Sequence, residues 1–264
     1  QLLEALQQQP KIITTLPSDN RAAITKVFFQ LVENKKIFIG RLQQKGRVYQ
    51  HANSSHTVID KQKLQQILPI TDHLQPNLEG VFWPDTYFYI AGTTDIELLL
   101  RAYKMMQEKL QLMWANRGNK LQVKSKVEAL VLASIVEKEA SIIAEYYKIS
   151  GVFQKRLQRN MPLQADPTVI YAMQQAKNFA TPLKKIDLAI ASPYNTYKYL
   201  ELPPMPIAIP SYRALHAVLH PIYSKDLYFV ADGKGGHVFS ATLAEHNKAV
   251  IKYRNDLLLQ KKNG

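Results

Sequence analysis

The sequence predicts an α+β fold that is mostly helical, with small antiparallel sheets. Two observations lead to this class. Several stretches carry apolar residues at helical spacing, and one pair of alternating segments near the C-terminus is joined by a Gly-rich turn. With 264 residues, of which 46% are hydrophobic, the chain is long enough for one large domain or two small ones.

The beginning of the chain predicts a smaller N-terminal helical region. Helices are expected around 18–34 and 60–68, because Ser18 and Asp60 are suitable N-caps. Pro76 marks the end of this region. The expected division is residues 1–75 for the N-terminal region, as a remnant of or connector to an upstream part, and residues 76–264 for the second.

Local patterns predict the elements of the second region in turn. The aromatic stretch 80–90 is interrupted by Pro84, which favours two short extended segments around a bend. Caps and apolar spacing then predict helices over about 95–116, from about 125 through Glu139, over 144–159 and over 242–259. Alternation predicts strands over 227–231 and 237–240, joined by the turn 232–236.

Regular patterning weakens between Met161 and Ser211, where proline is frequent. A long polar and aromatic stretch of this kind in a compact protein usually builds a site. The segments 163–168 and 192–197 offer amide, carboxylate, hydroxyl and phenol groups, and the segment 79–87 offers acids beside large aromatic faces. Because proteins hold sugars by aromatic stacking together with such polar groups, these segments favour a saccharide site.

Composition narrows the classes of function. The chain has no Cys, which excludes disulfides, thiolate metal sites and Cys nucleophiles. His216 and His220 have the spacing of a zinc-binding helix, but no Glu follows His216, so we expect no metal and no cofactor. The net charge of +13 fits an anionic partner. The basic residues are scattered and no nucleic-acid module is evident, so no nucleic-acid partner is expected.

Glu139 is the strongest candidate for chemistry. At helical spacing it shares an apolar face with Ile135, Val136, Ile142 and Ile143. Desolvation on such a face raises the pKa of a carboxyl group, and a Glu that stays protonated near neutral pH can protonate a leaving-group oxygen.

Glu137 is the rival acid on the same helix. It shares a mixed face with Ala133, Ser134 and Ser141, and we expect it to be more hydrated and to titrate as an ordinary acid.

Taken together, these segments resemble the YceG-like family of endolytic murein transglycosylases. The matching pieces follow the family's order from Leu78 to the C-terminal part of the chain. They are 78–87, 133–139, 161–171, 194–197, 202–204, 227–237 and 245–247.

The resemblance implies cleavage of the β-1,4 bond between MurNAc and GlcNAc within glycan strands, without water, to leave a 1,6-anhydroMurNAc end. The family's catalytic Glu carries over to Glu139, and Glu137 stays in reserve. The expected substrate-binding residues are Gln164, Asp166, Asn195, Tyr197, Glu79, Tyr87 and His237.

The resemblance also implies peptidoglycan glycan strands and peptidoglycan synthases as partners. The family's membrane helix and its LysM-like domain normally lie upstream, so this chain is expected to be the catalytic part of a longer protein. The implied location is the bacterial inner membrane, reached through an N-terminal anchor, with the catalytic domain in the periplasm.

Some positions depart from the family's pattern. Glu201, Met205 and Ser211 stand where Gly is usual, and Lys155 replaces the Asn of an Asn-Arg-Leu tripeptide, so loop conformation at these edges can differ. Two alternatives stay open. One is a hydrolytic muramidase with Asp166 or Glu79 as the second carboxylate. The other is a noncatalytic basic module that binds the wall or nucleic acid.

Overall fold

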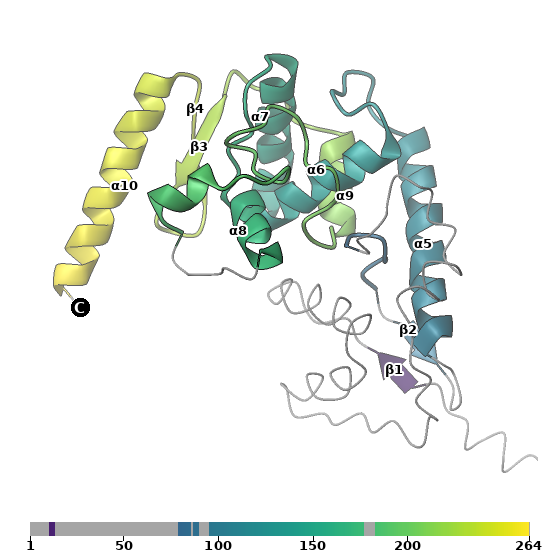
Figure 1. Cartoon of the computed structure of the whole chain (residues 1–264). Coiled ribbons are helices and arrows are strands. Elements are labelled where there is room, and N and C mark those ends of the chain that lie inside the picture. Colours follow the sequence, from purple (N-terminus) through teal and green to yellow (C-terminus); the bar gives the residue numbers. More distant parts are fainter. Residues whose placement is uncertain (1–10, 14–78, 86, 90–94, 177–182, 264) are drawn as a thin grey trace, which may run out of the picture. The chain divides into compact units, whose positions relative to one another are not determined.

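A computed structural model describes residues 11–13, 79–85, 87–89, 95–176 and 183–263 (Figure 1). The chain forms two compact units, Gln1–Gln111 and Leu112–Gly264. The predicted α+β class is confirmed, with helices dominating the described residues and antiparallel two-stranded sheets beside them. The helices expected at 18–34 and 60–68 lie outside the described residues.

The described residues of the first unit include a two-stranded sheet. Strand β1 (Lys11–Ile13) pairs antiparallel with β2 (Tyr87–Tyr89), so that Lys11 lies opposite Tyr89. The aromatic stretch was expected to form two extended segments, but residues 79–85 form a turn and bends instead, and only β2 is a strand. Gly80 allows this turn with φ of 76°. The helix predicted next is confirmed as α5 (Asp95–Ala115).

The second unit is built around α6 (Lys126–Glu139). The predicted start is confirmed, since Ser125 is the N-cap and its Oγ accepts a hydrogen bond from the N–H of Glu128 at 3.1 Å. Helices α7 (Tyr146–Gln158), α8 (Asp166–Gln175) and α9 (Tyr212–Leu219) all contact α6 (Figure 1). Every α6 residue from Ala129 to Glu137 is buried as a result.

The proline-rich stretch contains more regular structure than the sequence predicts. Helix α8 lies within it, as does the short 3₁₀ helix η5 (Lys185–Ala189). Asp166 and Pro167 occupy the first turn of α8, where a missing N–H costs nothing and an acidic side chain is favoured. Residues 205–210 are irregular but buried. The N–H of Ile207 there is satisfied by the Oγ of Ser134 on α6, at 2.9 Å.

The predicted hairpin is confirmed as β3 (Tyr228–Ala231) and β4 (His237–Ser240), with Ala231 opposite His237. The last helix, α10 (Leu243–Asn263), packs along both strands (Figure 1). The hairpin also meets α7, because the ring of Phe229 lies edge-on to that of Phe153 with centroids 5.6 Å apart.

Gly151 allows α7 to lie very close to the chain segment that follows α9. A Cβ on Gly151 would lie 2.0 Å from the carbonyl oxygen of Ile222. The N–H of Ile222 donates to the carbonyl oxygen of Tyr147 at 3.0 Å. This backbone contact requires Gly at position 151, since any side chain would push the two segments apart.

Candidate functional site

Glu139 is the last residue of α6 and remains partly accessible. Burial of its carboxyl, followed by the negative charge of Asp166, raises the pKa of Glu139 to about 8, even though the guanidinium of Arg156 partly offsets both. The C-terminal end of a helix also disfavours a negative charge. The prediction of a raised pKa is therefore confirmed, whereas the catalytic role of Glu139 stays a prediction.

The raised pKa of Glu139 was predicted from an apolar face along its helix, and the structure differs from that prediction in two respects. Helix α6 ends at Glu139, and Ala140 is extended with ψ of 124°, so the apolar face does not continue along the helix. Ile142 and Ile143 lie beyond the helix and are 42% and 58% exposed. The desolvation comes from the elements packed around the end of α6, not from a stripe on the helix itself.

Glu137 is not the hydrated acid that was expected. It is only 2% exposed, and its Oε2 accepts hydrogen bonds from the N–H and the Oγ of Ser211, at 3.2 and 2.7 Å. Ser211 is the N-cap of α9. Because all α6 residues from Ala129 to Glu137 are buried, this part of the helix has no solvent-exposed face, and Glu137 joins α6 to the start of α9.

The two loop segments predicted to form a site are bound to each other. The Oγ1 atoms of Thr168 and Thr196 lie 2.9 Å apart, and both side chains are buried. The N–H of Ala165 donates to the Oγ1 of Thr196 at 3.0 Å, and the N–H of Gln164 donates to the carbonyl oxygen of Thr196 at 3.0 Å. The segments 163–168 and 192–197 therefore form one rigid structure.

Asp166 and Tyr197 face each other across this structure. The Tyr197 hydroxyl donates to Oδ1 of Asp166 at 2.5 Å. Burial, followed by this bond and by the charges of Asp166 and Glu139, raises the pKa of Tyr197, so the phenol keeps its proton. Both residues are coupled electrostatically to Glu139. The structure thus brings together three of the predicted site residues.

Arg156 is a member of this cluster that the sequence analysis did not select. It is 6% exposed, and its Nε donates to the carbonyl oxygen of Leu227 at 2.7 Å. Its Nη1 donates to the carbonyl oxygens of Pro162 and Leu163, at 3.1 and 2.8 Å, and to Oε1 of Gln164 at 3.4 Å. The guanidinium also lies 5.1 Å from the centroid of the Tyr228 ring.

A signal for Arg156 was present in the sequence. It follows Ile149, Val152 and Phe153 at helical spacing, so it is a charged residue on the buried face of α7. Burial lowers its pKa, while the neighbouring Tyr228, Tyr197 and Glu139 act in the opposite direction. The guanidinium thus supplies a positive charge beside the carboxyl group of Glu139.

Gln164 and Asn195 occupy different surroundings. Gln164 is exposed and has a left-handed backbone with φ of 50°, a conformation that costs a non-Gly residue about 1 kcal/mol and often marks a functional segment. Asn195 is 0% exposed, and its Nδ2 donates to the carbonyl oxygens of Leu188 and Ile190, at 3.0 and 2.8 Å. Its Oδ1 accepts from the N–H of Tyr197 at 2.9 Å. Asn195 therefore holds the loop in shape.

The remaining predicted site residues are Glu79, Tyr87 and His237. Glu79 and Tyr87 belong to the first unit, where Glu79 is 5% exposed and Tyr87 begins β2. His237 begins β4 and pairs with Glu145. Substrate contacts of these three residues stay predictions.

The histidine pair on α9 is engaged in local contacts. Nδ1 of His216 lies 3.0 Å from the hydroxyl of Tyr147, and the rings of His216 and His220 have centroids 4.5 Å apart. Burial and the neighbouring His220 lower the pKa of His216. Within the described ranges, no group of three or more His, Cys, Asp or Glu side chains could hold a metal ion.

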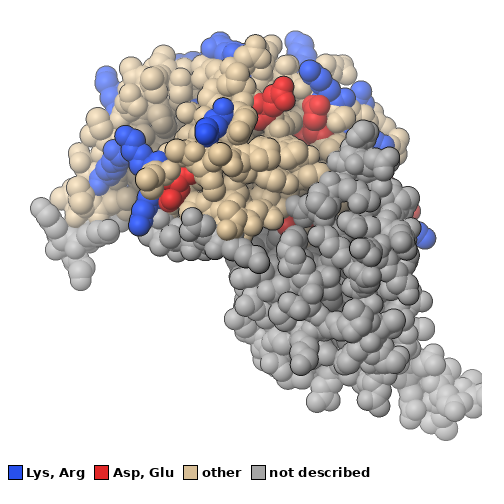
Figure 2. All heavy atoms as spheres, viewed as in Figure 1, with Lys and Arg blue, Asp and Glu red and all other residues tan. Residues whose placement is uncertain are grey.

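Lys and Arg side chains lie at several separate places on the face shown in Figure 2. This distribution agrees with the scattered basic residues of the sequence. In the part of the chain that the structure describes, none of the helices has both the length and the apolar character needed to cross a membrane.

Comparisons with known proteins agree on one family. Residues 2–252 match the model of the YceG-like family. The endolytic murein transglycosylase of Bacillus subtilis is 42% identical over 176 residues, which are 67% of this chain and 48% of that protein. The endolytic murein transglycosylase of Streptococcus pneumoniae is 35% identical over 210 residues, which are 77% of this chain and 37% of that protein.

A solved structure is also similar. The 2.6 Å crystal structure of a YceG-like protein from Listeria monocytogenes matches with a TM-score of 0.59 and 33% identity, over 71% of this chain and 62% of that one. The chain spans about half the length, or less, of the curated relatives that it matches.

Proposed function

Because the chain belongs to the YceG-like family, we propose that it is the catalytic part of a lytic transglycosylase. Its substrate is the β-1,4 bond between MurNAc and GlcNAc within peptidoglycan glycan strands, and its product carries a 1,6-anhydroMurNAc end. The observation that carries this proposal is the pKa of about 8 at Glu139, beside the carboxyl of Asp166 and the guanidinium of Arg156.

One carboxyl group is enough for this reaction. Protonated Glu139 donates its proton to the glycosidic oxygen as the bond from C1 of MurNAc to that oxygen breaks. The resulting carboxylate then takes the proton of the C6 hydroxyl while O6 forms a bond to C1. Glu139 ends protonated as it began, and no water is consumed. The nucleophile belongs to the substrate, so it is already close to the reacting carbon.

The neighbouring residues support this use of Glu139. With a pKa of about 8, about nine in ten carboxyl groups are protonated at pH 7. Asp166 favours that protonated form, and it will also stabilise the positive charge that develops at C1. Tyr197 holds Asp166 in place through its hydroxyl. The exposure of Gln164, on the loop that Arg156 fixes, supports its proposed role of offering an amide to the sugar.

Asp166 also favours the alternative, a hydrolytic muramidase. The electrostatic coupling between Asp166 and Glu139 is what a two-carboxylate glycosidase needs. Digestion of purified peptidoglycan followed by mass spectrometry separates the two reactions, because lysis yields anhydroMurNAc ends and hydrolysis yields reducing MurNAc. Anhydro products from the unaltered chain, and none from Glu139→Gln, are the expected result. If only reducing MurNAc ends form, the enzyme is a hydrolase and the proposed lytic reaction is wrong.

A noncatalytic role is tested separately. If neither product forms, co-sedimentation with purified sacculi and a gel shift with DNA tell whether the basic surface binds the wall or nucleic acid. We further propose that the domain acts outside the cytoplasmic membrane, where peptidoglycan lies. The upstream anchor and the synthase partners stay predictions.

A further inference from the structure

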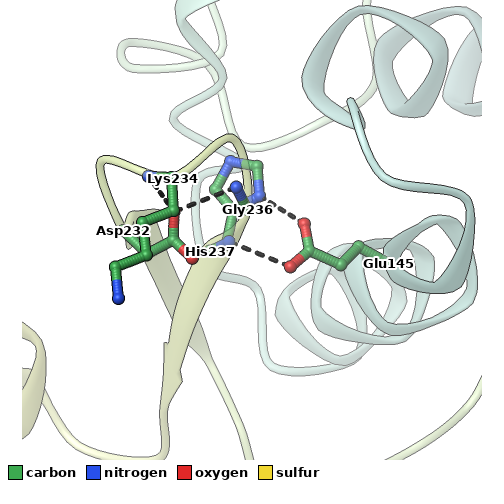
Figure 3. A network of polar contacts seen from close by, with 5 residues as sticks. All are labelled: Glu145, Asp232, Lys234, Gly236 and His237. Carbon is green, nitrogen blue, oxygen red and sulfur yellow. Dashed lines mark hydrogen bonds and ion pairs between the residues drawn. The ribbon is translucent and has the colours of Figure 1, made fainter.

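A polar network joins the hairpin turn to the segment that follows α6 (Figure 3). Glu145 is the last residue of the 3₁₀ helix η4 (Ile143–Glu145). Its Oε1 accepts the backbone N–H of His237 at 2.9 Å, and its Oε2 lies 2.7 Å from Nδ1 of the same residue. The side chains of His237 and Glu145 are only 13% and 14% exposed. Glu145 therefore holds His237 at two points, away from most of the solvent.

The hairpin turn is built to present these two donors. Oδ1 of Asp232 accepts the N–H groups of Lys234 and Gly236, at 2.7 and 2.9 Å (Figure 3). These backbone bonds lower the pKa of Asp232, so the group is a carboxylate at neutral pH. The N–H of Asp232 also donates to the carbonyl oxygen of Gly236 at 2.8 Å. The turn is thus rigid on the side that meets Glu145.

Gly236 allows the turn to approach the segment after α6. A Cβ at this position would lie 2.9 Å from Cδ1 of Ile142, 3.0 Å from Oε1 of Glu145 and 3.1 Å from Oδ2 of Asp232. Real Cβ atoms do not tolerate all three approaches without displacement of the neighbours. A side chain at position 236 would therefore have to displace the ends of three side chains, among them the carboxylate of Glu145 that holds His237.

The contact with the hairpin turn supports an exposed part of the segment after α6. Residues 141–144 are all exposed, whereas Ala140 and Tyr146 on either side of the segment are 3% and 0% exposed. The chain leaves the helix at Ala140 and regains helical structure at Ile143. Between them it makes the turn that ends α6 at Glu139. The packing of α6 fixes most of the helix, so the hold on residues 140–145 can act only on its last turn, where Glu139 lies.

We propose that His237 is a positioning residue for Glu139, which it orients by holding Glu145, and that it does not contact the substrate. This inference rests on the proposed function, because it presupposes that Glu139 is the acid. The ring has one orientation for this purpose. Nδ1 faces the carboxylate of Glu145, so this nitrogen carries the proton that is donated, and Nε2 lies on the other side of the ring. The inference replaces the substrate contact that the sequence analysis expected of His237.

Two isosteric substitutions separate positioning from substrate contact. The amide of His237→Asn reaches the position of Nδ1 and can still donate to Glu145, whereas the amide of His237→Gln reaches the position of Nε2. A displacement of about 1 Å in a catalytic group can cost about a hundredfold in rate. We therefore expect His237→Gln to lower kcat for anhydro-product release by roughly ten- to a hundredfold, with KM for soluble uncrosslinked glycan strands unchanged, and His237→Asn to restore most of it.

A second pair of variants tests the same contact from its other side. Gly236→Ala keeps both partners but separates them, and Glu145→Gln removes the carboxylate, so each should lower kcat without changing KM. The double variant of Glu145→Gln with His237→Gln should lose no more than either single variant, because one contact is broken in all three. Glu201→Gln, an exposed acid outside this network, is the matched control and should leave folding and product release unaltered. Circular dichroism confirms that each variant is folded.

The outcomes distinguish this inference from the proposed function. If the unaltered chain releases no anhydro product, the proposed function fails and this inference falls with it. If the unaltered chain is active but His237→Gln is active and His237→Asn is not, Nε2 contacts the substrate and only the positioning role is overturned. The positioning role is also overturned if folded His237→Gln and His237→Asn are equally active, or if only KM changes. A folded and fully active Gly236→Ala would do the same.

Discussion

Glu139→Gln should make the protein more stable at alkaline pH while removing its activity. The pKa of Glu139 lies at about 8 in the folded chain, against an ordinary value of 4.5. Each pKa unit corresponds to about 1.4 kcal/mol, so ionisation of Glu139 costs the folded state up to about 5 kcal/mol. Because part of the side chain is accessible, roughly 2–3 kcal/mol is a more realistic expectation.

The sign of this effect follows from where the proton is held. Between pH 4.5 and about 8 the unfolded chain has lost the proton of Glu139 and the folded chain still holds it. Unfolding therefore releases a proton, and the free energy of unfolding falls as pH rises through this window. Below pH 4.5 both states are protonated and this contribution is constant. The amide of Gln does not titrate, so the variant lacks this decline.

Urea unfolding of the unaltered chain and Glu139→Gln at pH 4 and pH 8 measures the difference. We expect the variant to gain stability relative to the unaltered chain between these two pH values, and to release no anhydro product at either. Loss of both the acid and the base role should lower activity below detection, since each is worth about a hundred- to ten-thousand-fold. A stability difference that does not change with pH would show that Glu139 is an ordinary acid, and would refute the reasoning.

Three further predictions follow from the same structure. Asp166→Asn should shift the alkaline fall of kcat/KM to lower pH by lowering the pKa of Glu139, and Arg156→Met should shift it to higher pH; identical profiles would exclude both couplings. Gly151→Ala should lower the free energy of unfolding by about 1–3 kcal/mol, because the added methyl group meets a backbone carbonyl; unchanged urea unfolding contradicts this. Sacculus binding should weaken as salt rises, while turnover of short neutral fragments changes little, and salt-independent co-sedimentation argues against an electrostatic contribution.

The elements that sequence patterns predicted well are those whose signals are local. Ser125 caps α6 through its own side chain, and the hairpin follows from strict alternation around a Gly-rich turn. Helix α8 was missed because frequent prolines favoured an irregular stretch. Pro167 stands in the first turn, where proline is compatible with a helix. A single proline therefore marks a helix start as readily as a loop, and only the packing of the following residues decides.

The site was predictable as a set of segments but not as a geometry. The loops containing Asp166 and Tyr197 were selected because both combine polar groups with rigid backbone, and the structure brings these two residues into contact. Arg156 was not selected, although it lies on an apolar helical face as Glu139 was argued to do. Its importance comes from acceptors on Leu163 and Leu227, one of them 71 residues away in the sequence. Periodicity within one helix carries no information about such distant partners.

Glu137 and Glu139 show where the periodicity argument failed. Two acids two positions apart were distinguished by assuming that one face of the helix is exposed to water, yet every α6 residue from Ala129 to Glu137 is buried. The carboxyl groups of Glu137 and Glu139 differ in the kind of helix terminus that each one lies beside. Glu137 accepts hydrogen bonds at the N-terminus of α9, from a residue 74 positions later, where a carboxylate is favoured. Glu139 lies at the C-terminus of its own helix beside Asp166, where a carboxylate is disfavoured. Glu137→Gln should therefore impair folding first and product release only as a consequence.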